Sequence, residues 1–344
     1  MQRMLRANKR LLRQNGYLYP GDSVSAHFMA SLDLRGVDFH GHTYPDSEGA
    51  WARIVREVDR FQGTSLISHE TLTRSPEPMI KKAVESFATD DVRVVITARD
   101  LARQVPAVWQ ERLKHAHQET YAEFLASQFD SAAGRRRRNG FWGGQHLLNV
   151  TRRWAGVVGP DRMTVVTLPP SGADPQELWR RFTAAVGLPE LHYDFDIGPA
   201  NPSLGVVEAE LLRRLNAHLQ ELPWPQYERL IKGRFAERRL APVTSSDRLS
   251  VPERYREEIE TVSTRAIGYL RTSGCRIVGD VQDLEPRWGD QPASMPELVE
   301  SEPMLEVALK LLADYAAEPQ AVVRPQVPPM QRFRTKVREV LTRG

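Results

Sequence analysis

Residues 92–98 read VRVVITA, and this stretch decides the fold. It is a nearly continuous apolar run rich in β-branched residues, which is typical of a central strand in a parallel sheet. Two further runs have the same character, TSLIS at 64–68 and MTVVTLP at 163–169. The segment RIVGDV at 276–281 is either a last short strand or an extended closing segment. The sequence therefore predicts a parallel sheet built from these runs.

Segments with helical spacing of apolar residues separate the predicted strands. Residues 1–14 have this spacing and end at Asn15-Gly16, a helix-stop signal, and Tyr17–Tyr19 follows as a short β-like piece. Further helices are predicted over 48–61, 76–87, 100–116, 120–129, 145–157, 174–187, 206–221, 252–272 and 296–316. This alternation indicates an α/β fold, a parallel sheet flanked by helices. We expect one α/β domain over 1–286 and a helical, partly flexible extension over 287–344.

The composition excludes several classes of protein. The chain has 344 residues, with 47 Lys and Arg against 44 Asp and Glu, a net charge of +3, and one cysteine. A lone cysteine excludes a disulfide-stapled scaffold and a Cys-rich zinc or iron–sulfur module. No apolar run approaches the ~20 residues of a membrane span, and the start lacks the apolar region of a signal peptide. We therefore expect a cytoplasmic protein without a membrane partner.

The densest charge cluster is Arg135–Arg138, in the stretch SAAGRRRRNGFWGG. It is either a solvated loop or a flap that contacts an anionic ligand or nucleic acid through phosphate pairing. No nucleic-acid-binding motif accompanies it, so a nucleic-acid partner is not expected.

Chemistry-bearing residues follow the predicted strands directly. His69 and Glu70 come after TSLIS, and Arg99 comes after VRVVITA. Ligands of open α/β sheets bind beyond the carboxyl ends of the strands. A His or Glu there can act as a general base, and an Arg can grip a phosphate. The alternatives are structural: a helix cap or ion pair for His69 and Glu70, and an ion pair with a neighbouring acid for Arg99.

An ordered set of segments carries a wider resemblance: SLISHETL, VRVVITARDLARQVPAVWQE, FWGGQHLLNVTRRWAGVVGPDRMTVVTLPP, ELWRRFTAAVGL and GCRIVGDVQDLEP. From residue 1 to about 286 the chain resembles a bacterial, actinobacterial-type branch of the sulfotransferase family. The resemblance implies a parallel sheet akin to that of P-loop nucleotide kinases. It also implies transfer of a sulfuryl group from 3′-phosphoadenosine 5′-phosphosulfate to a hydroxyl or amine of a small-molecule or glycan acceptor, without a metal.

The resemblance also implies roles for individual residues. Arg99 resembles the arginine that binds the cofactor 3′-phosphate, and Ala107 stands where the family usually has a serine that shares this contact. The residues that could compensate are Gln104, Arg103 and Lys114. His69 stands at the position of the catalytic histidine, with Glu70 as the alternative base.

Weaker matches remain open. Lys232, Gly233 and Arg234 fall where the family has a late basic loop over the 3′-phosphate, or they form a solvated helix end. Asn201 and Ser203 either line the site or form a turn and a helix cap. Trp142 is the tryptophan expected to touch an acceptor. His40 and His42, with His27 upstream, lack the spacing of a metal site, so no metal is expected.

The family begins with a strand and an anion-binding loop that have no counterpart in this sequence. Residues 1–14 resemble the helix that follows that loop. We therefore expect that the first strand is missing and that the reading frame extends upstream of Met1. The alternative is a non-catalytic remnant that binds a nucleotide or a protein partner through the same sheet edge. A third hypothesis is an interaction protein that uses the Arg cluster and a basic tail, Arg332, Arg334, Lys336 and Arg338, on an anionic surface.

Overall fold

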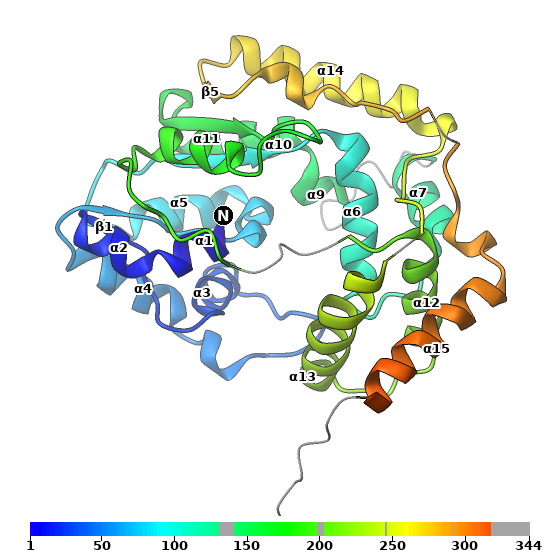
Figure 1. Ribbon diagram of the computed structural model, residues 1–344. Helices are drawn as coiled ribbons and strands as arrows, with labels where there is room; N and C mark the ends of the chain where they lie inside the picture. The colour runs from blue at the N-terminus through cyan, green and yellow to red at the C-terminus, as the bar shows by residue number, and fades with distance from the viewer. Residues whose placement is uncertain (131–140, 198–202, 245, 291, 318–344) are drawn as a thin grey trace, which may run out of the picture. The chain divides into compact units, whose positions relative to one another are not determined.

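The computed structural model describes residues 1–130, 141–197, 203–244, 246–290 and 292–317. The chain divides into two compact units, Met1–Met304 and Leu305–Gly344. The first unit contains every described strand (Figure 1). Of the second unit, residues 305–317 are described, as the last part of helix α15 (Ser301–Ala317). Arg135–Arg138, Asn201 and the basic tail lie outside the described residues.

Two small parallel sheets form the centre of the first unit. Strands β1 (Tyr17–Leu18) and β2 (Thr64–Ser65) pair in parallel. Strands β3 (Val94–Ala98), β4 (Met163–Thr167) and β5 (Arg276–Val278) form a second parallel sheet in the order β3-β4-β5. The mixed α/β class with parallel sheets flanked by helices is thus confirmed, and 276–278 is a strand. TSLIS is extended over only two paired residues, which is shorter than predicted.

Helices occupy most of the segments between the strands, close to the predicted ranges. Their bounds are α1 (Gln2–Ala7), α2 (Lys9–Gln14), α3 (Ala26–Arg35), α4 (Ala50–Asp59), α5 (Glu77–Glu85), α6 (Leu101–Leu113), α7 (Tyr121–Phe129), α9 (Phe141–Gln145), α10 (Leu147–Val158), α11 (Glu177–Val186), α12 (Val206–Ala217), α13 (Trp224–Tyr227) and α14 (Arg256–Thr272). A 3₁₀ helix spans Glu70–Arg74, and a π-helix that the sequence did not predict spans Glu228–Leu240. Within the described residues, no helix combines the length and the apolar character that a membrane span requires.

The first predicted helix is divided at Asn8 into α1 and α2. Asn8 is buried, and its side chain bonds both to the helix and to a distant loop: Nδ2 donates to Met4 C=O and to Asp194 C=O, each at 3.0 Å. Its Oδ1 accepts the Asp194 N–H at 2.8 Å. The polar side chain therefore satisfies backbone groups of the 193–194 segment, and the helix breaks where this anchor sits.

Helices α5, α10, α11 and α14 pack against the three-stranded sheet. A cluster of buried side chains joins α5, α10 and β4 through Ile80, Trp154 and Met163. A second cluster joins β3 and β4 to α14 through Ala98, Val165 and Ile267. Helix α11 packs against β4 and β5. This packing fixes the strand ends, and with them the residues that follow each strand.

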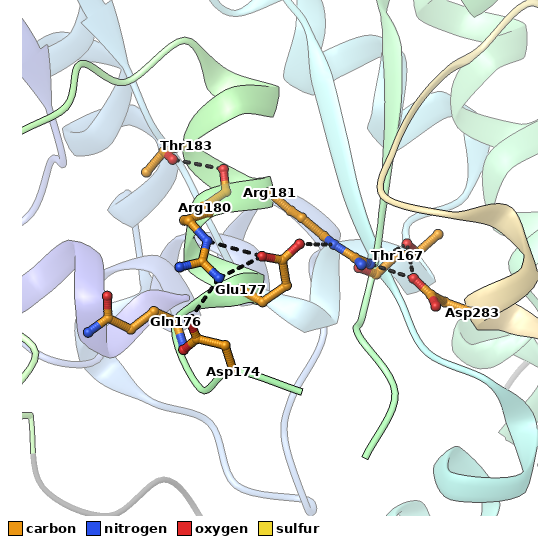
Figure 2. A network of polar contacts seen from close by, with 8 residues as sticks. All are labelled: Thr167, Asp174, Gln176, Glu177, Arg180, Arg181, Thr183 and Asp283. Atoms are coloured by element: carbon orange, nitrogen blue, oxygen red, sulfur yellow. Dashed lines mark hydrogen bonds and ion pairs between the residues drawn. The ribbon is translucent and has the colours of Figure 1, made fainter. Parts of the chain in front are cut away.

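A polar network lies at the carboxyl end of β4, as Figure 2 shows. The Arg181 guanidinium donates to the C=O (2.9 Å) and Oγ1 (2.8 Å) of Thr167 and to Asp283 Oδ2 at 2.5 Å. Glu177 accepts from Arg181 Nε at 2.9 Å and also from Arg180. The network holds the chain after β5 against the end of β4.

Candidate functional site

A cavity of about 2270 Å³ lies between β2 and β3. Consecutive residues of both strands line it, 64–70 from the β2 side and 91–99 from the β3 side. The two strands are not paired with each other in the described part of the chain. The cavity therefore lies between the two sheets and reaches the residues that follow both strands.

Helix α9 connects the carboxyl ends of β2 and β3. Gln145 Oε1 accepts from Gln104 Nε2 at 2.9 Å, in the first turn after β3. The Arg153 guanidinium bonds to both Gly143 C=O and Thr73 C=O, so it joins α9 to the turn after β2. His69, Glu70, Arg99 and Gln104 all line the one cavity. The predicted base and the predicted anion-binding arginine thus line the same cavity.

His69 ends the β2 segment and caps the 3₁₀ helix Glu70–Arg74. Its side chain is 10% exposed, and its ring lies 5.2 Å from that of Phe28. Burial lowers the pKa of His69, the nearby Glu70 raises it, and the charges of Arg35 and Lys232 lower it again, so that the pKa lies below its ordinary value. The imidazole is therefore neutral at pH 7, the form in which it accepts a proton.

A chain of hydroxyl groups forms one of two hydrogen-bond arrangements around His69. Ser31 Oγ donates to Phe28 C=O at 2.8 Å, so it receives the Thr71 hydroxyl proton across their 2.5 Å contact. The Thr71 oxygen then offers only lone pairs to His69 Nδ1, 2.7 Å away. In this arrangement Nδ1 carries the proton and Nε2 keeps its lone pair, whereas in the tautomer that caps the 3₁₀ helix Nδ1 accepts the Thr71 N–H. The longer 3.3 Å contact from Thr71 N–H to the same nitrogen belongs to the other tautomer.

Glu70 is in a different environment from His69. Its side chain is 75% exposed and accepts from Gln2 Nε2 at 2.7 Å, while Oε1 lies 3.8 Å from His69 Nε2. Of the two predicted candidates, His69 is the more buried.

Arg99 lies at the end of β3 without an ion pair among the described residues. Its neighbour Asp100 is taken by Arg103, which donates its backbone N–H to Oδ1 at 3.0 Å and its guanidinium to Oδ2. Arg99 Nε is buried and has no hydrogen-bond partner in the part of the chain that the structure describes. Burial lowers the pKa of Arg99, as does the charge of Arg103, while Asp100 raises it. A buried donor of this kind is costly unless it meets an anion.

The structure adds cations that the sequence reasoning missed. Arg35, Arg74 and Arg112 also line the cavity. The Nε of Arg35 is buried without a hydrogen-bond partner, and burial followed by the charge of Arg74 lowers the pKa of Arg35. Neither Arg35 nor Arg74 follows a strand or belongs to a motif, because Arg35 ends α3 and Arg74 ends a 3₁₀ helix. Only the fold brings them to the cavity.

Lys232 lines the cavity on the side of α6. Its Nζ donates to Glu111 Oε1 and to His115 Nε2, both at 2.7 Å. Lys114 is buried, with its Nζ 3.9 Å from Glu111 Oε2. Arg234 is exposed and is not among the residues that line the cavity. The structure thus places Lys232, but not Arg234, on the same cavity as Arg99.

The remaining residues that the sequence singled out differ in their surroundings. Gln104 and Ala107 line the cavity. Arg103 is held by Asp100 and by Pro169 C=O, which accepts from its Nη1 at 3.0 Å. Ser203 is exposed. Trp142 is buried, and its Nε1 donates to Gln128 C=O at 3.0 Å.

His27 connects the two strands of the smaller sheet. Its Nε2 lies 2.8 Å from Pro20 C=O, and its Nδ1 accepts the Ser68 N–H at 3.0 Å. Both ring nitrogens are therefore used in holding the segment that ends at His69. Within the described residues no group of three His, Cys, Asp or Glu side chains is placed to hold a metal ion.

No model of a known protein family, no curated protein and no solved structure matches this chain.

Proposed function

We propose that this protein transfers a sulfuryl group from 3′-phosphoadenosine 5′-phosphosulfate to a hydroxyl or amine of a small-molecule or glycan acceptor, in the cytoplasm, as a member of the sulfotransferase family with its P-loop-like architecture. The observation that carries the proposal is the placement of neutral His69 and unpaired Arg99 on one cavity at the carboxyl edge of parallel strands. This edge is where open α/β sheets bind their ligands.

Arg99 fits the 3′-phosphate of the donor. A guanidinium with a buried and unpartnered Nε gains charge-assisted hydrogen bonds when a phosphate arrives, and it loses no existing ion pair. Gln104, one turn along α6, offers an amide on the same cavity. Arg35, the other cavity arginine with an unpartnered Nε, fits the second anionic end of the donor.

His69 supplies the base. Nε2 accepts the proton of the acceptor O–H or N–H while the acceptor atom forms its bond to sulfur. The sulfur–oxygen bond to the 5′-phosphate breaks, and its electron pair leaves with adenosine 3′,5′-bisphosphate. Thr71 Oγ1 accepts a hydrogen bond from Nδ1–H, which favours the imidazolium that forms. The cations around the cavity offset the charge that develops on the leaving phosphate.

Binding is tested by calorimetric titration of adenosine 3′,5′-bisphosphate. Arg99→Ala should lower the affinity by about 10- to 100-fold, the value of one or two charge-assisted hydrogen bonds. Arg180→Ala is the matched control, because Arg180 is 55% exposed and does not line the cavity. Equal affinities for the wild type and Arg99→Ala would remove Arg99 from the site.

Catalysis is tested with ³⁵S-labelled donor and a panel of phenols, sugars and amines. His69→Ala should lower turnover by about 10²- to 10⁴-fold without weakening adenosine 3′,5′-bisphosphate binding. Binding without turnover for any acceptor would favour the second candidate, a nucleotide-binding protein without catalysis. Full turnover in His69→Ala would transfer the role of base to Glu70.

A further inference from the structure

Helix α3 and the 3₁₀ helix after β2 are joined by a contact between two hydroxyl groups. Ser31 Oγ lies 2.5 Å from Thr71 Oγ1, which in turn lies 2.7 Å from His69 Nδ1. The two helices also pack against each other. The contact therefore shows which face of each helix is turned toward the other.

The next side chain on each of these two faces is an arginine. Arg35 stands four residues after Ser31 in α3, and residues at this spacing lie on one face of an α-helix, about 5 to 6 Å apart. Arg74 stands three residues after Thr71, and side chains at this spacing eclipse each other in a 3₁₀ helix. Arg35 and Arg74 therefore face each other one turn beyond the hydroxyl contact. The pKa of Arg35 agrees, because burial and then the charge of Arg74 lower it.

The Arg35 guanidinium has no hydrogen bond or ion pair within the described residues. An arginine in the last turn of a helix is ordinarily stabilised by solvent and by the helix dipole. The Nε of Arg35 is buried, however, so it has lost its water and regains a hydrogen bond only from an acceptor. The acceptor that suits two guanidinium groups facing each other is an anion that both of them contact.

Arg74 is packed against helix α9. A Cβ atom at Gly144 would lie 2.9 Å from Arg74 Cγ and 3.1 Å from its Nε, so only glycine leaves room for this side chain. Burial lowers the pKa of Arg74, and the charge of Arg112 lowers it further. Because Arg74 lines the cavity, this packing holds its charge at the cavity wall.

The two arginines lie beside His69 and apart from Arg99. Burial lowers the pKa of His69, Glu70 raises it and the charge of Arg35 lowers it, so Arg35 is within electrostatic range of the imidazole. The charges that act on Arg99 are those of its own neighbours, Arg103 and Asp100. The cavity thus contains two separate cationic places, of which one adjoins the base.

We propose that Arg35 and Arg74 form a binding site for a tetrahedral oxyanion beside His69, and that this site holds the sulfuryl group during its transfer. The second part rests on the proposed function. The sulfur atom forms its new bond to the acceptor atom whose proton passes to His69, so the sulfuryl group has to lie next to the imidazole.

The two arginines then act on the group that moves. The bond from sulfur to the bridging oxygen of the 5′-phosphate breaks, and its electron pair leaves on that oxygen. The other sulfuryl oxygens keep their negative charge throughout, and Arg35 and Arg74 donate hydrogen bonds to them. These contacts orient the sulfur toward the acceptor and offset the charge that repels an attacking oxygen or nitrogen.

The first test uses inorganic sulfate as the probe, without any donor. In ¹⁵N-labelled protein at constant ionic strength, the NMR signals of Arg35 Nε–H and of the His69 amide should shift with sulfate and saturate. Arg35→Met should weaken this binding, followed at His69, by about tenfold or more, the value of a charge-assisted hydrogen bond. Arg99→Met should leave it unchanged. Arg56→Met is the matched control, because Arg56 is an exposed arginine of α4 that does not line the cavity.

The second test moves Arg74 without removing a charge. Gly144→Ala pushes against the Arg74 side chain and should weaken sulfate binding by about threefold to tenfold, while the melting temperature stays close to that of the wild type. Gly156→Ala in α10 is the matched control, because its Cβ would meet nothing within 4 Å. Shifts that do not saturate, or equal sulfate affinities in the wild type and Arg35→Met, would overturn the proposal.

The third test separates the sulfuryl group from the 5′-phosphate. Arg35→Met should lower kcat by about 10²- to 10³-fold, as loss of one oxyanion donor does. Its affinity for adenosine 3′,5′-bisphosphate, which lacks the sulfuryl group, should stay within about threefold of the wild type. A loss of this affinity as large as the loss of kcat would assign Arg35 to the 5′-phosphate and contradict the proposal.

The outcomes distinguish this proposal from the proposed function. Saturable sulfate binding that depends on Arg35, without turnover of any acceptor, would support the oxyanion site and contradict sulfuryl transfer. Turnover with an unchanged kcat in Arg35→Met would support the transferase and remove Arg35 from the reaction.

Discussion

Arg103 holds the carboxylate of Asp100 twice, through its backbone N–H at 3.0 Å and through its guanidinium. Asp100 is buried and caps α6 through the first of these contacts. The acid next to Arg99 in the sequence is thereby used for the helix, and Arg99 is left as a cation without an ion pair in the described chain. Because both contacts of Asp100 are with Arg103, the guanidinium of Arg99 stays available to an anion at the end of β3.

This arrangement predicts opposite costs for two neighbouring arginines. Arg99→Met should leave the free energy of unfolding unchanged or raise it, because it removes a partly buried charge that has no partner. Arg103→Met should lower it by about 2 kcal/mol, because it leaves Asp100 buried without its ion pair. Urea unfolding of both variants without ligand measures the difference. A large loss of stability in Arg99→Met alone would mean that Arg99 has a structural role.

A second prediction concerns the hydroxyl group of Thr71. Thr71→Val removes the acceptor for His69 Nδ1–H, and turnover should fall by about tenfold, the value of one hydrogen bond. KM for the donor should not change, because the Thr71 hydroxyl bonds to Ser31 and His69. Thr71→Ser should restore most of the rate.

The matched control for this prediction is Thr73→Val in the same 3₁₀ helix. The Thr73 hydroxyl donates to Glu70 C=O and does not touch His69. If both valine variants lose turnover equally, the effect comes from the turn and not from the orientation of the imidazole.

The sequence predicted the elements that local patterns determine. β3 and β4 combine β-branched runs with flanking turns, and the structure confirms both as neighbours in a parallel sheet. β2 is shorter than its apolar run because its partner β1 pairs with it over only two residues. The break at Asn8 could not be predicted, because its cause is a loop 186 residues away in the sequence.

The residues of the candidate site also fall into two groups, those that a local sequence signal predicts and those that it does not. His69 and Arg99 were found because they follow strands directly, and parallel strands deliver such residues to one edge. Arg35 ends a helix, and no local signal distinguishes it from a solvated arginine. Its unpartnered Nε is a consequence of tertiary packing and is visible only in the fold.

The histidines predict how stability depends on pH. Burial is the main cause that lowers the pKa of His27 and His69, and it lowers the pKa of His115 to about 3 and of His117 to about 4. In the unfolded chain these groups titrate near pH 6.5. Between pH 6.5 and about 4 the unfolded state therefore binds more protons than the folded state. The free energy of unfolding consequently decreases as the pH is lowered through this range. Above pH 7 these histidines are neutral in both states, so they should add no pH dependence to the free energy of unfolding.

This dependence is measured by urea unfolding from pH 7.5 to 4.5. Each strongly shifted histidine contributes at most about 1.4 kcal/mol per pH unit. His115→Gln should flatten the curve, because glutamine offers Lys232 an acceptor that does not titrate in this range. An unchanged slope in His115→Gln would show that His115 is accessible to protons in the folded state.

The last prediction concerns Asp283 and Arg181 at the end of β4 (Figure 2). Their side chains are 7% and 15% exposed, and Asp283 Oδ2 accepts from both Arg181 and Thr167. Asp283→Asn leaves Arg181 with Glu177 as its remaining acidic partner in the described chain, and should cost about 3 kcal/mol of unfolding free energy. Arg180→Ala, which breaks only the exposed ion pairs of the same network, should cost less than about 1 kcal/mol.

Because the network lies outside the cavity lining, neither change should alter the affinity for adenosine 3′,5′-bisphosphate in protein that remains folded. Similar costs for the two variants would mean that burial does not strengthen the Asp283–Arg181 pair.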